Sequence, residues 1–327
     1  NEIECPAVAV TNAFNTVLWT GDGISGRAIS VGFQPDMSWY KSRNNAYDHN
    51  LSDSVRGAQK QIRPNRDIAE VSATDQITAF TSTGLTLGSG GDANGGSNQT
   101  YVAWNWKAGG TAVSNTDGTI TSQVSANVDA GFSIVKFTSN ASTLTAGHGL
   151  NSIPDLIIVK ATSFADSWFV NSSALTNQTD RALRLNATSA EETNSAFWNN
   201  VAPTSTTFSL GNGISINGNS YIAYCFASKA GYSKVGSYVG TGATGNVQYL
   251  GFEPAFLLVK RTSSTSDWYM IDNKRNPSNP RNSWLNANTS TAEYTPSHGV
   301  DFLSNGFSFI STDLNGTGQS WIFLAIA

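Results

Sequence analysis

The chain has 327 residues and a formal net charge of −4, and only 13% of its residues are charged, about half the share usual in globular proteins. This weakly acidic balance gives no basic footprint for nucleic acid or for an anionic membrane surface. No apolar run approaches the roughly 20 residues that a membrane-spanning helix needs. We therefore expect neither a nucleic-acid partner nor membrane insertion.

The sequence contains three copies of one repeat. A Pro and a Lys at one fixed spacing enclose a short, largely apolar run in each copy, which is typical of a strand buried on both faces. An aromatic closing strand follows at nearly the same distance each time. The pairs are Pro35 and Lys41, Pro154 and Lys160, and Pro254 and Lys260, and the closing strands begin at Tyr101, Tyr221 and Trp321. A repeat at one period indicates three copies of one structural unit.

Other landmarks keep the same order in the copies. Opening strands are predicted near Phe14, Phe132 and Tyr232, and an acidic residue follows each Lys as Asp48, Asp166 or Asp267. Asn, Ser, Thr and Gly clusters between these landmarks favour tight turns. We predict an all-β protein with three tandem β-sandwich, jelly-roll-like domains.

The landmarks also give the domain boundaries. Residues 1–108 form repeat 1 with an N-terminal extension, 109–130 a connector rich in Gly, Ser, Thr and Asn, 131–230 repeat 2, and 231–327 repeat 3. The alternating segment 119–125 in the connector is expected to add an edge strand. The stretch 51–62 is the best candidate for a helix. Because the second and third copies abut without a spacer, we expect a rigid or semi-rigid array.

The residues that could carry chemistry favour a non-enzymatic protein. His49, His148 and His298 lie at unrelated landmarks, which favours exposed loop histidines over a metal site. Glu191 and Glu192 are adjacent, so on a strand they would face opposite ways. The repeated Lys and Asp pairs are explained by structure more simply than by an active site present three times. We predict no catalytic residue, no cofactor and no bound metal.

Cysteines and tryptophans give two further expectations. Cys5 and Cys225 are too few for a disulfide framework, and Cys225 is expected to be a buried thiol. Most tryptophans fall at repeat landmarks and are assigned to cores. Trp198 and Trp284 are off register, so we expect them in variable loops as contacts for a glycan or a partner.

The chain resembles a family of repeat domains found in tail-fibre-like virion structural proteins of tailed bacteriophages, of the marine-phage type. The resemblance covers residues from about 13 to the C-terminus. Its motifs are GFQPDMSWYKSR, YVAWNWKAGG, GHGLNSIPDLIIVK, SYIAYCFASKAGYSKVGSY and FLSNGFSF. These motifs are specific in order and spacing, but they carry no established catalytic residue.

The resemblance implies a place in the extracellular phage particle, on the surface of the tail or capsid. It implies a tail fibre, appendage or receptor-binding component that attaches to host-surface glycan, with other virion proteins as partners and a homotrimer or other homo-oligomer as the assembly. One alternative is a capsid or tail decoration protein that cements neighbouring subunits. A polysaccharide-degrading spike enzyme is the third hypothesis, and it requires carboxylates that converge in a cleft.

Overall fold

The computed structural model describes residues 10–327, whose regular secondary structure consists almost entirely of antiparallel strands. The single helix of these residues, α1, covers only Gly91–Asn94. The all-β fold is therefore confirmed. No helix among the described residues is long and apolar enough to cross a membrane.

Each repeat builds one large sheet around the same order of strands: the opening strand, the closing strand, the strand after the Pro, and the next strand along the chain. In repeat 1 this sheet runs β1-β9-β3-β4-β5-β6. Its strands are β1 (Phe14–Thr20), β9 (Thr100–Trp106), β3 (Met37–Ser42), β4 (Asn50–Asp53), β5 (Gly57–Ile62) and β6 (Val71–Ser72).

The large sheet of repeat 2 has the order β10-β11-β12-β19-β14-β15-β16-β17. Its strands are β10 (Val113–Asn115), β11 (Ser122–Asn127), β12 (Phe132–Thr138), β19 (Ser220–Phe226), β14 (Leu156–Ala161), β15 (Trp168–Ser172), β16 (Arg181–Arg184) and β17 (Glu192–Thr193). The connector thus contributes β10 and β11, which confirms that it adds strands at the sheet edge.

Repeat 3 has the shortest large sheet, β20-β27-β22-β23-β24. Its strands are β20 (Ser233–Val239), β27 (Ser320–Ile326), β22 (Phe256–Arg261), β23 (Trp268–Asp272) and β24 (Leu285–Asn286).

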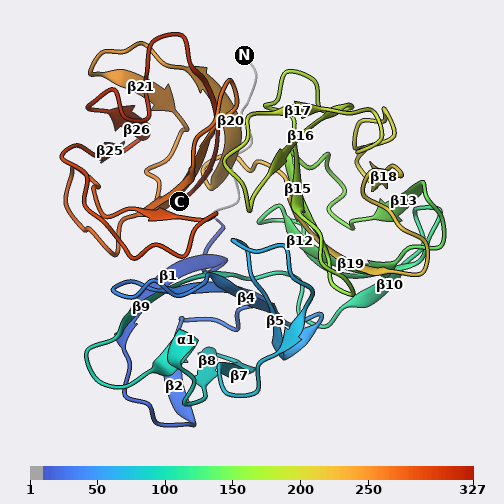
Figure 1. The fold of residues 1–327 in the computed structure, drawn as a ribbon, viewed down its shortest axis with the longest axis horizontal. Coiled ribbons are helices and arrows are strands. Elements are labelled where there is room, and N and C mark those ends of the chain that lie inside the picture. Colours follow the sequence, from blue (N-terminus) through green and yellow to red (C-terminus); the bar gives the residue numbers. More distant parts are fainter. Residues whose placement is uncertain (1–9) are drawn as a thin grey trace, which may run out of the picture.

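A small second sheet covers the outer face of each large sheet, which makes every repeat sandwich-like (Figure 1). The small sheets are β2-β8-β7, β13-β18 and β21-β26-β25. Their strands are β2 (Arg27–Ser30), β7 (Ile77–Thr81), β8 (Gly84–Leu87), β13 (Leu144–Gly147), β18 (Thr207–Leu210), β21 (Asn246–Tyr249), β25 (Val300–Leu303) and β26 (Gly306–Phe309). A separate apolar core fills the space between the two sheets of each repeat.

The three repeats surround a common centre and do not extend in a line. In Figure 1 they occupy three sectors, blue to cyan, green to yellow, and orange to red. The inner faces of the three large sheets share one further core, to which all three repeats contribute. The repeats are therefore closed into a ring around this core.

The helix predicted over 51–62 is wrong, because the segment is the hairpin of β4 and β5. Leu51 pairs with Ile62 across the hairpin, and both side chains belong to the shared core. Gly57 supplies a φ of 107° just after the turn, a value that residues with a Cβ rarely adopt. Pairing with β3 on one side therefore overrides the local helical pattern.

Candidate functional site

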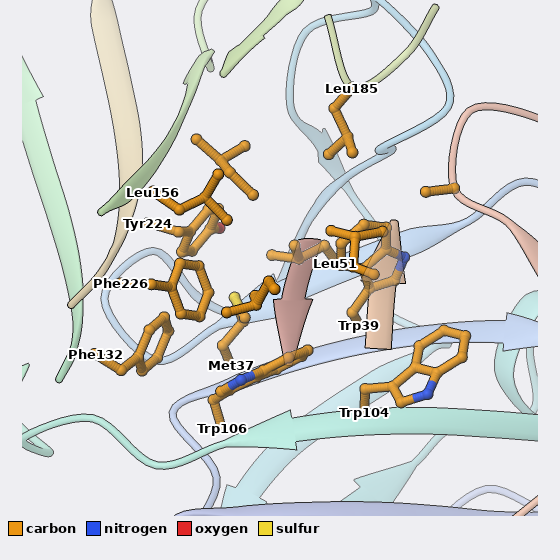
Figure 2. Close-up of a cluster of buried hydrophobic side chains, with 14 of the residues drawn as sticks. Met37, Trp39, Leu51, Trp104, Trp106, Phe132, Leu156, Leu185, Tyr224 and Phe226 are labelled. Atoms are coloured by element: carbon orange, nitrogen blue, oxygen red, sulfur yellow. The ribbon is translucent and has the colours of Figure 1, made fainter. Parts of the chain in front are cut away.

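The shared core is the feature that involves the most residues of the three repeats. Figure 2 shows Trp39, Trp104 and Trp106 of repeat 1 in one cluster with Tyr224 and Phe226 of repeat 2, and the rings of Trp106 and Phe226 lie 6.3 Å apart between centroids. The empty space at this centre is only about 10 Å³, which is barely enough for one water molecule. The centre therefore holds the repeats together and offers no room for a ligand.

Each strand that follows a Pro serves two cores at once. In β14 every side chain is buried. Ile158 contacts the shared core, while Ile157 and Val159 lie in the core of repeat 2 itself. Successive side chains of a strand point to opposite faces, so the continuous apolar run in the sequence reflects burial on both sides.

Backbone hydrogen bonds join each repeat to the next in a cycle. The amide of Glu70 donates to the Thr162 carbonyl, that of Glu191 to the Thr262 carbonyl, and that of Glu293 to the Arg43 carbonyl, at 2.9, 3.0 and 2.6 Å. Thr162, Thr262 and Arg43 each lie just after the repeated Lys. The same contact is thus made at all three junctions, and the ring is closed by repeat 3 binding repeat 1.

Buried tryptophans reinforce two of these junctions. The Trp168 indole of repeat 2 donates to the carbonyl oxygens of Arg63 and Arg66, and the Trp268 indole of repeat 3 donates to the Arg184 carbonyl. At the third junction His49 stands at the corresponding position. It accepts a hydrogen bond from the Trp39 indole at Nδ1, and burial keeps its pKa well below 6.5.

Two junctions also contain a buried ion pair. In repeat 1, Asp53 pairs with Arg56 at 2.6 Å, and the Asp53 carboxylate accepts a hydrogen bond from the Tyr224 hydroxyl of repeat 2. Arg56 makes a second ion pair with Glu70 at 3.0 Å. Because both side chains of the Asp53 and Arg56 pair are buried, removing one of them would leave the other charge without its main partner, at a large cost in folding free energy.

The junction between repeats 3 and 1 reproduces this arrangement. Asp272 pairs with Arg275, which also contacts Glu293, and Asp272 accepts a hydrogen bond from the Trp104 indole of repeat 1. The side chains of Asp272 and Arg275 are 0% exposed.

Repeat 2 has no charge at the corresponding positions. Ser172 pairs with Leu156 as Asp272 pairs with Phe256, so Ser172 and Leu175 replace the Asp and Arg. The closing strands differ at one corresponding position as well. Leu324 of repeat 3 occupies the position of Trp104 in repeat 1 and of Tyr224 in repeat 2. The register of the three closing strands shows this, since Leu324 pairs with Leu258, Trp104 with Trp39, and Tyr224 with Ile158. At the junction between repeats 2 and 3, Ser172, Leu175 and Leu324 therefore replace the acid, the base and the polar aromatic residue of the other two junctions. This set was missed in the sequence, although Asp-x-x-Arg recurs at one offset in copies one and three.

The repeated lysines bind backbone carbonyl groups. Lys260 Nζ donates to the carbonyl oxygens of Thr188 and Ser266, and Lys160 Nζ to those of Ala161 and Asp67. Thr188 and Asp67 belong to the preceding repeat. No Lys and Asp pair of the repeated motif lies within salt-bridge distance in the described residues, where Asp48 pairs with Arg63 instead, so these lysines bind carbonyl oxygens and not the acids that follow them. Burial lowers the pKa of Lys260 to about 7 and those of Lys41 and Lys160 to about 8.

We expect stability to rise with pH from about pH 7, the lowered pKa of Lys260, to about pH 10, near the ordinary pKa of a lysine. A lysine whose pKa is lower in the folded chain binds fewer protons there than in the unfolded chain, so raising the pH favours the folded state until the unfolded lysine also deprotonates. Lys260→Met should flatten this slope in urea unfolding measured across the range, whereas Lys136→Met, at an exposed lysine, should keep it. A slope unchanged by Lys260→Met would contradict the assignment.

The two tryptophans expected to face outward are buried. Trp198 is 1% exposed in the core of repeat 2, and Trp284 is 3% exposed in the core of repeat 3. Their indoles donate to the carbonyl oxygens of Arg181 and Arg281. The prediction of exposed loop positions is wrong, because a segment outside the repeat landmarks can still fold inward and fill its own sandwich.

We therefore expect Trp198→Ala and Trp284→Ala each to cost about 3–5 kcal/mol of unfolding free energy. The cause is loss of buried aromatic area and of a hydrogen bond. Urea unfolding followed by circular dichroism measures this directly. Unchanged stability in either variant would contradict the assignment of its tryptophan to the core.

The remaining sequence candidates are accounted for by packing. His49 and His148 lie between strands as expected, but both are buried, which corrects the prediction that they are exposed; of the three histidines only His298 is exposed. Glu191 binds Arg181, and Glu192 binds Arg184. Cys225 is buried as expected, while Cys5 lies outside the described residues. Within residues 10–327, no three His, Cys, Asp or Glu side chains gather as a metal site would require.

A hollow of about 750 Å³ opens between repeat 1 and the connector. Its buried acid, Asp36, is already used: it accepts hydrogen bonds from the Ser54 hydroxyl and from the amides of Ala108 and Gly110. These bonds fix the exit of β9 into the connector. Asp129 is the other acid that lines the hollow, while the Asp36 carboxylate is held by these three hydrogen bonds.

These features define a class: an all-β protein whose three sandwich-like repeats close around one core through a repeated set of cross-repeat contacts. A family model described as "Domain of unknown function (DUF7483)" matches residues 9–327, so the chain belongs to that family. Among curated proteins, no significant match was found.

Proposed function

We propose that this chain is a non-enzymatic structural protein of a tailed bacteriophage particle, serving as a tail appendage or receptor-binding component. The observation that supports this most is the closed ring of cross-repeat hydrogen bonds from Glu70, Glu191 and Glu293. Such a ring makes one stiff body with three outward-facing lobes. The phage-like motifs supply the central strands of that body, β3, β14, β9 and β19.

Use of the polar groups within the ring also supports a structural role. The buried acids and bases are paired with one another or bound to backbone groups, as for Arg56 and Arg275. A spike enzyme would need carboxylates free to act on a sugar.

Contacts to host glycan would lie on the outer lobes. Of the described residues, Tyr249 is the one aromatic among the exposed large apolar side chains, at 67% exposure on β21. An aromatic ring of this kind can stack on a sugar. We therefore assign any aromatic contact to a host sugar to Tyr249 in place of Trp198 and Trp284. Loss of binding to host glycan on Tyr249→Ala, with binding retained by Val239→Ala, is the expected result on a glycan array.

Cryo-EM of intact virions tests the proposal. We expect density for the three-lobed body to project from the tail, with the lobe that carries Tyr249 free. Density that lies across capsid or tail-tube subunits would overturn the receptor-binding role in favour of decoration. A homo-oligomer, expected from the resemblance, would have to use outer surfaces, because the inner apolar faces are consumed within one chain.

A further inference from the structure

The three repeats differ in what lies beside one corresponding edge of the large sheet. This edge is the outer side of the opening strand, which is β1 in repeat 1, β12 in repeat 2 and β20 in repeat 3. Half of the backbone N–H and C=O groups of an edge strand point away from its sheet and can pair with another strand.

In repeat 2 the connector fills the edge. β11 pairs antiparallel with β12 along its whole length, and Val124 stands opposite Val135. Both valines are buried in the core of repeat 2. Ile120 bridges to Ala146 of β13, so the same segment also reaches the small sheet. One extended segment thus closes the open side of the sandwich.

In repeat 3 a side chain closes the corresponding position. Gly236 stands where repeat 2 has Val135, and it pairs with Phe323 where Val135 pairs with Ala223. The Phe323 ring occupies the space beside Gly236, since a Cβ there would lie 2.6 Å from Phe323 Cζ. No described strand lies on the outer side of β20, so at this point an aromatic side chain fills the core in place of an added strand.

Among the described residues, repeat 1 has neither an added strand beside β1 nor an aromatic ring in the place of Phe323. Val17 pairs with Ala103, the combination found in repeat 2, but no described strand lies beside β1. Val17 is only partly buried, and Leu18 is 38% exposed. The described residues that precede β1 do not turn back along it, because Val10 and Ala13 pack into the shared core.

An open groove of about 550 Å³ results between β1 and β2. Along one side run residues 15–19 and along the other residues 27–30, with Lys274 of repeat 3 at the rim. Of the described residues that line it, Arg27 and Lys274 are cations and none is acidic. Arg27 already lies 3.4 Å from Asp22, which leaves Lys274 as the charge available to a partner.

We propose that β1 accepts an extended, antiparallel strand from a partner polypeptide, which completes the sandwich of repeat 1 as β11 completes that of repeat 2. The partner strand carries a β-branched or small apolar side chain opposite Val17, as Val124 lies opposite Val135. An acidic residue near one end would complement Lys274. Main-chain pairing supplies affinity in such strand addition, and alternate side chains supply specificity. This inference is independent of the proposed role in a phage particle.

The test uses a synthetic peptide with the sequence of residues 117–127 and Val124→Cys, activated as a mixed disulfide with 2-thiopyridine. The full chain carries Cys5→Ser with either Val17→Cys or Leu18→Cys, and attack by the introduced thiolate releases thiopyridone, which is read by absorbance. Binding raises the effective concentration of the peptide, so we expect Val17→Cys to react about tenfold faster with this peptide than with a scrambled one. Leu18→Cys, on the opposite face of β1, should react equally with both.

Equal rates for the two peptides at Val17→Cys would overturn the proposal. Faster reaction after removal of residues 1–9 would assign the groove to the chain's own N-terminus, and a rate that falls as protein concentration rises would assign it to a second copy. Either result would also overturn it. Hydrogen exchange on the unmodified protein with the unmodified peptide needs no substitution. Slower exchange in β1 but not in β20 is expected, and unchanged exchange in β1 would contradict the proposal.

Discussion

Asp272→Ala should destabilise the protein by about 3–5 kcal/mol, the range seen when one partner of a buried ion pair is removed. The Arg275 side chain is fully buried and would lose its 2.5 Å contact with the carboxylate. The Trp104 indole of repeat 1 would lose its acceptor as well. The loss should appear as a lower midpoint in urea unfolding.

The chain supplies its own control at the junction between repeats 2 and 3, where Ser172 and Leu175 occupy the same positions. Asp272→Ser combined with Arg275→Leu removes the buried cation together with its partner, and Glu293 keeps its ion pair with Arg43. We expect this double variant to be at least about 2 kcal/mol more stable than Asp272→Ala, because it leaves no buried arginine without its main partner. A double variant no more stable than the single one would show that the ion pair itself stabilises the ring.

The central strands show which features of the fold could be predicted from the sequence and which could not. Registers of the central strands were predictable, because Pro, Lys and the closing aromatic keep their spacing in each copy. The apolar run of β14 also indicated burial on both faces. That second face implies another apolar surface, but the pattern does not say which one. A sister repeat and a foreign subunit would require the same side chains.

The direction of Trp198 and Trp284 illustrates a second limit. A repeat comparison assigns residues to cores only where the copies agree, and each of these tryptophans occurs in one copy alone. Trp284 packs beside Tyr269 and Tyr294, which is a solution particular to repeat 3. Core packing within one repeat is determined by local volume, and spacing between copies carries no information about it.

Separating repeat 3 from the rest should have the other largest effect. The shared core includes Phe256, Leu258 and Trp268 of this repeat, and burial of each such side chain stabilises by about 1.5–3 kcal/mol. A fragment of residues 231–327 alone would expose this face to water. We expect it to self-associate or precipitate, as measured by light scattering after size exclusion.

Co-expression with the fragment of residues 1–230 should rescue it. A cut between Ala230 and Gly231 falls at an exposed turn and leaves every cross-repeat contact available, including the bonds from Glu191 to Thr262 and from Glu293 to Arg43. We expect a one-to-one complex that stays intact at micromolar concentration, whereas Leu258→Asp in the smaller fragment should prevent its formation, since a carboxylate would have to be buried unpaired. A monomeric, cooperatively unfolding fragment 231–327 that ignores its complement would mean that the repeats are independent domains. If the complex forms, the inner face of each large sheet is half of a core and needs its complement. If fragment 231–327 is stable alone, that face is a surface that already tolerates water.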